Sequence, residues 1–79
     1  MFLEITQAEY LYGYKLKVTF NNGECRICDF AGVIRRYPVF APLNNVTLFK
    51  NFTITDTLEW NNGSIDIAPE YVYEHGKAA

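Results

Sequence analysis

Apolar and polar residues alternate from Tyr14 to Phe20, and this is the clearest pattern along the chain. Such an alternation predicts a β-strand with one buried face. The run is followed by Asn21-Asn22-Gly23 and then by a second apolar-rich run, Glu24–Phe30. Asn-Gly is a strong hairpin signal, because a type I′ turn requires positive φ at both central residues. The sequence therefore predicts a β-hairpin whose tip is Asn22-Gly23.

The position of this tip decides which side chains reach the core. Opposed residues of a hairpin share one face of the sheet. The core face is expected to carry Leu16, Val18, Phe20, Cys25 and Ile27, with Asp29 at its end. The outer face is expected to carry Lys17, Thr19, Arg26 and Cys28. An inward-pointing carboxylate needs a partner, so we expect Asp29 to cap a backbone group or to form a salt bridge.

A second hairpin is predicted from the same kind of turn. Leu58-Glu59-Trp60 precedes Asn61-Asn62-Gly63, and Ser64–Ile67 follows. With Asn62-Gly63 at the tip, the expected cross-strand pairs are Trp60 with Ile65, Leu58 with Ile67, and Glu59 with Asp66. This register places the apolar residues on one face of the hairpin and both carboxylates on the other.

The remaining segments predict shorter elements. Phe2–Tyr12 is expected to provide a leading strand, and Phe52–Thr55 is expected to provide another. Pro38 and Pro42 exclude the stretch between the hairpins from central strands, because proline cannot donate to a ladder.

Two short helices are predicted by their end residues. Asn45 is a favourable N-cap for a helical turn over residues 45–50. Pro69 suits the first position of a helix and Gly76 suits the position after its end, so a helix is expected over Pro69–His75. Glu70 lies near the positive end of that helix dipole, where a carboxylate is stabilising.

Together these elements predict an α+β fold in a single domain. We expect a small, mainly antiparallel sheet built from two β-hairpins with Asn-Gly turns, plus one or two short helices. The domain is expected to span residues 1–76, and residues 77–79 are expected to form a disordered tail.

The charge balance argues against nucleic-acid binding. The chain has 7 Lys and Arg against 9 Asp and Glu, giving a formal net charge of −2. Nucleic-acid affinity depends largely on Lys and Arg at phosphates, so no direct binding is expected. The adjacent pair Arg35-Arg36 is interpreted as part of a solvated loop. No signal peptide or membrane-spanning apolar run is present in the sequence, so we expect a cytoplasmic protein without membrane contact.

The two cysteines have a spacing that redox and zinc sites use. Cys25 and Cys28 form a C-x-x-C motif. On one strand, however, these two positions point to opposite faces, so the thiols cannot bridge or share a metal there. We therefore expect two unlinked thiols with Cys25 in the core, and neither a metal nor a cofactor.

Other candidate catalytic groups are few. Ser64 and His75 are the only serine and the only histidine. No nucleophile-elbow motif surrounds Ser64, so we interpret it as a turn residue. His75 is expected to end the last helix, where a cation is favourable. Glu59 and Asp66 form a carboxylate pair of the kind that supports acid–base catalysis, which makes a small hydrolase using these two with His75 the least favoured hypothesis.

The tyrosines favour a protein contact surface, because interfaces are enriched in this residue. Six are present: Tyr10, Tyr12, Tyr14, Tyr37, Tyr71 and Tyr73. The leading segment Glu4–Tyr12 lacks proline, so as an edge strand it is expected to accept a second chain, as a homodimer or a partner complex. The alternative is a monomer in which the last helix covers this segment through Tyr71 or Val72. The candidate functional surface comprises Arg26, Asp29, Glu59, Asp66, Tyr10 and Tyr12.

Three stretches together resemble one known family. They are residues 14–26 with Asp29-Phe30, Pro38–Leu43 with Leu48-Phe49, and Leu58–Gly63 with Asp66–Glu74. This combination resembles small bacterial domains catalogued as Domain of Unknown Function 2442, over roughly residues 8 to 74. One departure is Asn61, where that family usually has Pro, and this loosens the expected second turn. The resemblance implies a compact α+β fold and no assigned catalytic residues.

The resemblance also implies a biological context. Members of the family look like stand-alone proteins or modules beside a DNA-binding helix-turn-helix, and some are encoded next to another small protein, as toxin–antitoxin pairs are. We therefore expect a non-catalytic protein-interaction or regulatory module, such as the neutralising, antitoxin-like partner of a second small bacterial protein from a neighbouring gene. The alternative is a transcription-associated accessory domain that acts through a DNA-binding partner.

Overall fold

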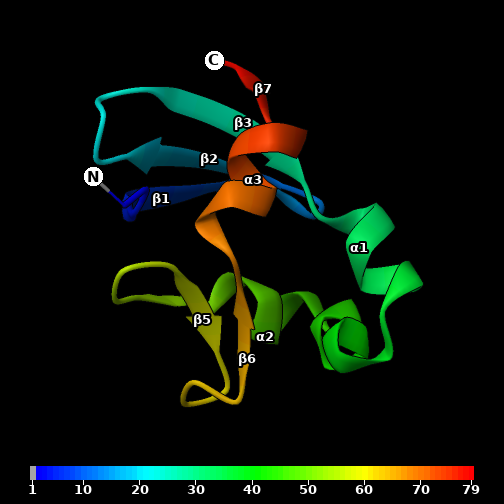
Figure 1. Ribbon diagram of the computed structural model, residues 1–79. Coiled ribbons are helices and arrows are strands. Elements are labelled where there is room, and N and C mark those ends of the chain that lie inside the picture. The colour runs from blue at the N-terminus through cyan, green and yellow to red at the C-terminus, as the bar shows by residue number, and fades with distance from the viewer. Residues whose placement is uncertain (1) are drawn as a thin grey trace.

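The chain folds into two small antiparallel sheets connected by short helices (Figure 1). The computed structural model describes residues 2–79. The four-stranded sheet has the order β1-β2-β3-β7, and the three-stranded sheet has the order β4-β5-β6. The elements in chain order are β1 (Ile5–Tyr12), β2 (Lys15–Phe20), β3 (Cys25–Asp29), α1 (Ala31–Arg36), the 3-10 helix η1 (Pro38–Asn44), α2 (Val46–Lys50), β4 (Thr53–Ile54), β5 (Leu58–Trp60), β6 (Ile65–Ile67), α3 (Pro69–His75) and β7 (Lys77–Ala78). The predicted α+β class is confirmed, although the two hairpins lie in separate sheets.

The second hairpin has the register that the sequence predicts. β5 and β6 pair Leu58 with Ile67, Glu59 with Asp66, and Trp60 with Ile65. The turn between them uses the left-handed region, with φ of 55° at Asn61, 57° at Asn62 and 85° at Gly63. Asparagine and glycine adopt this region at lower cost than other residues, so the Asn-Asn-Gly sequence suits the turn.

The first hairpin is shifted by one residue from the predicted register. β2 and β3 pair Thr19 with Cys25 instead of Phe20 with Cys25. The Phe20 N–H donates to the Glu24 carbonyl at 2.9 Å, and the Gly23 N–H donates to the Phe20 carbonyl at 2.9 Å. The loop is therefore Asn21–Gly23, in which Gly23 has a φ of 87° and supplies the left-handed residue. This is a longer hairpin loop ending in a left-handed glycine, and the predicted type I′ turn at Asn22-Gly23 was wrong.

Local side-chain hydrogen bonds explain why both asparagines belong to this loop. The Asn22 Oδ1 atom accepts the Glu24 N–H at 3.0 Å. The Asn21 side chain accepts the Glu4 N–H at 3.1 Å and donates to the Phe2 carbonyl at 2.8 Å. Such asparagine contacts with the backbone compete with strand pairing and favour a turn.

The shifted register exchanges the two faces of β3, because a slip of one residue turns every side chain to the other face. Cys28, predicted on the outer face, is buried at 3% exposure, and Arg26 points to the same side. Cys25 and Ile27, predicted in the core, are half-buried on the outer side. Asp29 is exposed and does not point inward. The predicted faces of β3 were therefore wrong.

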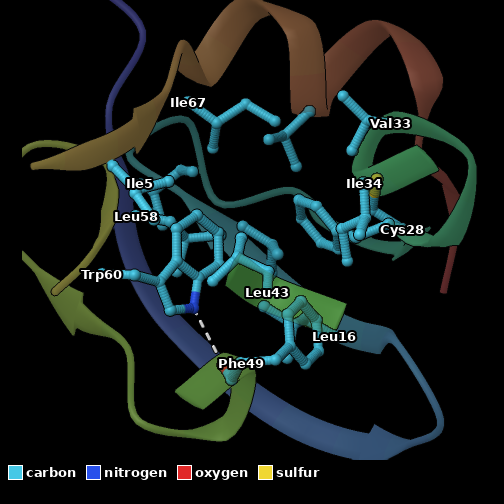
Figure 2. Close-up of a cluster of buried hydrophobic side chains, with 14 of the residues drawn as sticks. Ile5, Leu16, Cys28, Val33, Ile34, Leu43, Phe49, Leu58, Trp60 and Ile67 are labelled. Atoms are coloured by element: carbon cyan, nitrogen blue, oxygen red, sulfur yellow. Dashed lines mark hydrogen bonds between the residues drawn. The ribbon is translucent and has the colours of Figure 1, made fainter. Parts of the chain in front are cut away.

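One hydrophobic core joins both sheets and all the helices (Figure 2). Trp60 connects the three-stranded sheet to α2, since its indole stacks on Phe49 with ring centres 6.0 Å apart. Its Nε1–H donates to the Phe49 carbonyl at 2.8 Å, shown as a dashed line in Figure 2. The buried polar atom of the indole is thus satisfied. The buried apolar residues are Ile5, Leu16, Val18, Phe20, Cys28, Phe30, Val33, Ile34, Leu43, Phe49, Leu58, Trp60, Ile65, Ile67 and Val72.

The two predicted helices form where their end residues indicate. The Asn45 Oδ1 atom accepts the Thr47 N–H at 3.0 Å, which confirms Asn45 as the N-cap of α2. α3 begins at Pro69 and ends at His75, as predicted. Pro38 and Pro42 lie in η1 and not in a strand, also as predicted.

The helix α1 was not predicted. Arg35 and Arg36 therefore occupy the last turn of a helix, where basic side chains are favourable, and not the loop that the sequence suggested. α1 is short and buries only Val33 and Ile34, so it contains too few turns to produce a recognisable helical period.

The end of the chain also differs from the expected disordered tail. Lys77 and Ala78 form β7, which pairs with Ile27 and Arg26 of β3. The tail has no strand pattern of its own. It becomes ordered by pairing with the neighbouring edge of β3, and this edge exists only once the chain has folded.

We expect Gly23→Ala to lower the free energy of unfolding by about 1–2 kcal/mol. A Cβ at Gly23 meets no described atom within 4 Å, so the cost comes from its φ of 87° alone. Gly32→Ala is a matched control inside α1, with equally open space and no left-handed φ, and it is expected to raise stability by about 0.5–1 kcal/mol. Chemical denaturation measures both changes. An unchanged midpoint for Gly23→Ala would contradict the loop conformation.

Candidate functional site

β1 forms an open edge of the four-stranded sheet (Figure 1). It pairs with β2 on one side and stands at one end of the strand order. At its start, the Ile5 N–H donates to the Asp56 carbonyl at 2.9 Å, so this end is held by the chain between β4 and β5. Register shifts between Ile5 and Gln7 and between Tyr10 and Tyr12 leave residues 7–10 as the regular part of the strand. A regular open edge has the geometry that accepts an additional strand.

The last helix packs elsewhere. α3 lies against β3, and its Tyr73 ring meets the Phe20 ring edge-on with centres 5.1 Å apart. Val72 is fully buried in the core, and Tyr71 lies in a hollow with Cys28. The helix α3 therefore packs on β3, and Tyr71 and Val72 do not cover the leading strand as the alternative expected.

The two tyrosines of β1 have different environments. The Tyr10 ring packs edge-on against Phe49 with centres 6.3 Å apart, and its hydroxyl donates to the Gly13 carbonyl at 3.0 Å. Tyr12 is 64% exposed, and the Lys15 Nζ lies 3.2 Å from its hydroxyl. Tyr10 thus contributes mainly to packing, whereas most of the Tyr12 side chain is exposed.

Arg26 attaches α3 to the first hairpin. Its guanidinium carbon lies 3.6 Å from the Tyr73 ring centre, and the guanidinium also donates to the Tyr73 carbonyl. A second N–H donates to Glu24 at 3.3 Å. The hydrogen bond from the Tyr73 hydroxyl, together with Arg26, lowers the pKa of the Glu24 carboxyl below its ordinary value. Arg26 was predicted on the outer face of the hairpin, but it lies on the same side of β3 as Cys28 and makes these contacts within the chain.

The two thiols are free, as predicted. Burial, with a smaller contribution from the Asp29 charge, raises the pKa of the Cys28 thiol to about 11. This thiol stays protonated near neutral pH and is a poor nucleophile, because the thiolate is the reactive form. Within residues 2–79, no group of three or more His, Cys, Asp or Glu side chains is placed to hold a metal ion.

Asp29 and His75 lie together at the C-terminal end of α3. The Asp29 Oδ1 atom accepts the Ala31 N–H at 2.9 Å, so Asp29 caps a backbone group as expected. His75 stacks on Tyr71 with ring centres 3.9 Å apart. Both residues line a hollow of about 540 Å³, which Arg35 and Arg36 also line. Sequence reasoning missed this basic hollow because it placed the arginines in a loop, although an adjacent basic pair also suits a helix end.

Glu59 and Asp66 face each other across β5 and β6, as predicted. The Glu59 carboxylate accepts the Thr55 hydroxyl at 3.0 Å. Asp66 is exposed and lines a hollow beside the start of α3, whereas His75 lines the hollow at the end of that helix. The three residues of the hydrolase hypothesis therefore do not line a common hollow.

Within the part of the chain that the structure describes, no helix is long and apolar enough to cross a bilayer.

Comparison with known proteins identifies one family. A family model described as "Protein of unknown function (DUF2442)" matches residues 5–78. No curated protein and no solved structure matches the chain. The matched range begins with β1 and reaches β7. The chain therefore belongs to the DUF2442 family.

Proposed function

We propose that the protein is a non-catalytic interaction module, the neutralising, antitoxin-like or regulatory partner of a second small protein. In this proposal an extended segment of the partner adds to the open edge of β1. The observation that carries it is the difference between the two edges of the four-stranded sheet. β7 forms one edge with only Lys77 and Ala78, whereas β1 forms the other with Ile5–Tyr12. Very short edge strands discourage pairing, and long regular ones invite it.

The side chains of β1 supply features that distinguish one partner from another. Backbone hydrogen bonds along residues 7–10 give affinity for any extended segment, and side chains that alternate along the strand give specificity. Gln7 and Glu9 are exposed along this segment, and Tyr12 is exposed at its end. The expected partner segment therefore has polar groups that meet Gln7 and Glu9, and an apolar or cationic group that meets Tyr12.

The proposal is tested with a tagged protein and one edge variant. Proteins retained by the wild type from native cell lysate are identified, and the retained partner is then purified and titrated calorimetrically. Leu11→Lys places a charge on the β1 edge, where lysine opposes strand addition. We expect the dissociation constant of the partner for Leu11→Lys to rise by at least about tenfold, a difference of roughly 1.4 kcal/mol.

Val46→Lys serves as the matched control. Val46 is an exposed apolar residue, 40% exposed at the start of α2, so this change also replaces an apolar side chain with lysine. Its partner affinity is expected to equal that of the wild type. Equal binding by all three proteins would show that the partner docks elsewhere. If the wild type retains no stoichiometric partner, the proposed role is wrong.

A further inference from the structure

An apolar hollow of about 260 Å³ lies between η1, β6 and the start of α3. Tyr37, Val39, Phe40 and Tyr71 are among the side chains that line it. Val39 is 57% exposed and Tyr37 is 43% exposed, although both are large hydrophobic residues. Val33 of α1, Ile67 of β6 and Tyr71 of α3 also line it, so these three elements meet at the hollow. Exposed aromatic and aliphatic side chains gathered in one place indicate a contact surface.

Two charged hollows share lining residues with the apolar one. The basic hollow is lined by Arg35 and Arg36, and it shares Tyr71 with the apolar hollow. The acidic hollow is lined by Glu70, and it shares Asp66 with the apolar hollow. We call these three hollows together the α1–α3 face.

The charged side chains of the α1–α3 face form no salt bridge among the described residues, although Asp29 also lines the basic hollow. Among the described residues, the single salt bridge joins Arg26 to Glu24, away from this face. The Arg36 guanidinium lies 6.0 Å from the Tyr37 ring centre, so it borders the apolar hollow directly. Asp66 lines the apolar hollow from the acidic side. The face thus has an apolar centre, a positive border and a negative border.

A second copy of the chain has the charges that fit this face. When two copies are related by a twofold axis through the apolar centre, the positive border of each copy meets the negative border of the other. Each charge contact is then formed twice, and the exposed apolar side chains are buried between the copies. We propose that the chain forms a twofold-symmetric homodimer through the α1–α3 face, with Arg36 of each copy paired with Asp66 of the other. β1 is not part of this face, so the dimer goes beyond the proposed partner binding.

Sedimentation analysis of two charge reversals tests the dimer. The wild type is expected to sediment as a dimer, with an affinity that decreases as salt increases. Arg36→Glu and Asp66→Lys each place like charges at both borders, so each is expected to raise the dimer dissociation constant by at least about tenfold. When the two variants are mixed, both borders again carry opposite charges. The mixture is therefore expected to form a heterodimer with nearly the wild-type affinity.

Lys17→Glu is the matched control, since it has the same net charge as Arg36→Glu but lies on β2, outside the face. It is expected to remain a dimer alone. With Asp66→Lys it is expected to form a weaker heterodimer than Arg36→Glu does, because only one of the two charge contacts then joins opposite charges. Leu11→Lys is expected to dimerise like the wild type. A wild-type monomer at millimolar concentration would overturn the proposal. So would a dimer that Leu11→Lys abolishes and Arg36→Glu retains, because the β1 edge would then join the copies.

Discussion

Trp60→Ala is expected to lower the free energy of unfolding by about 3–5 kcal/mol. Trp60 is 1% exposed and contacts the Phe30 ring at 6.1 Å and the Phe49 ring at 6.0 Å between centres. The truncation leaves a cavity between the three-stranded sheet and α2, and it also removes the hydrogen bond from the indole to the Phe49 carbonyl. A chain of 79 residues has a total stability of about 4–12 kcal/mol, so this loss takes much of it.

Trp60→Phe separates packing from hydrogen bonding in the same site. It keeps an aromatic ring but removes the N–H that satisfies the Phe49 carbonyl, so it is expected to cost about 1–3 kcal/mol. Urea denaturation followed by circular dichroism measures both variants, because the sequence contains a single Trp and the variants lose its fluorescence. A loss below about 1 kcal/mol for Trp60→Ala, typical of a surface position, would contradict the position of the indole in the core.

Cys28→Asp is expected to destabilise the protein by about 3–5 kcal/mol, because it places a carboxylate at a buried position of the core. Cys28 is 3% exposed and pairs with Leu16, which is fully buried. The exposed Asp29 follows it directly, so a second carboxylate there is also repelled. The expected result is a protein that is largely unfolded or has a strongly reduced denaturation midpoint.

Ile27→Asp is the control that makes the Cys28 experiment a test of register. Ile27 lies on the outer side of β3 opposite Lys17, so an aspartate there gains a cross-strand partner of opposite charge. It is expected to cost less than about 1 kcal/mol. The register predicted from the sequence gives the opposite ranking. A larger loss for Ile27→Asp than for Cys28→Asp would therefore contradict the pairing of β2 with β3.

The contrast between the two hairpins shows what sequence patterns can decide. In the second hairpin, a register shifted by one residue would turn Ile65 and Ile67 of β6 away from the face that carries Leu58 and Trp60, so burial and turn chemistry select the same pairing. In the first hairpin, the two candidate registers each bury one cysteine. The alternation of apolar and polar residues along the strands does not favour one register over the other. The contact of Arg26 with Tyr73 favours the observed register, and Tyr73 lies in a helix far along the chain. A pattern of residues within the hairpin cannot indicate a contact with so distant a residue.

The candidate site was predictable only in part for the same reason. The sequence could indicate that the leading strand, if it lies at an edge, is open to strand addition, because it lacks proline. The α1–α3 face could not be predicted, because it combines Arg36 from an unpredicted helix with Asp66 from a distant strand. Its residues are adjacent only after the three-stranded sheet has packed against α1 and α3.

Amide hydrogen exchange of β1, with and without the retained partner, is the most direct test of the proposed interaction edge. Strand addition forms new backbone hydrogen bonds along residues 7–10, so exchange there is expected to slow on binding. Exchange of Lys77 and Ala78 in β7 is expected to stay unchanged, since that edge lies at the far side of the sheet. Unchanged exchange along β1, together with slower exchange in α1 or α3 of the bound protein, would contradict the proposal.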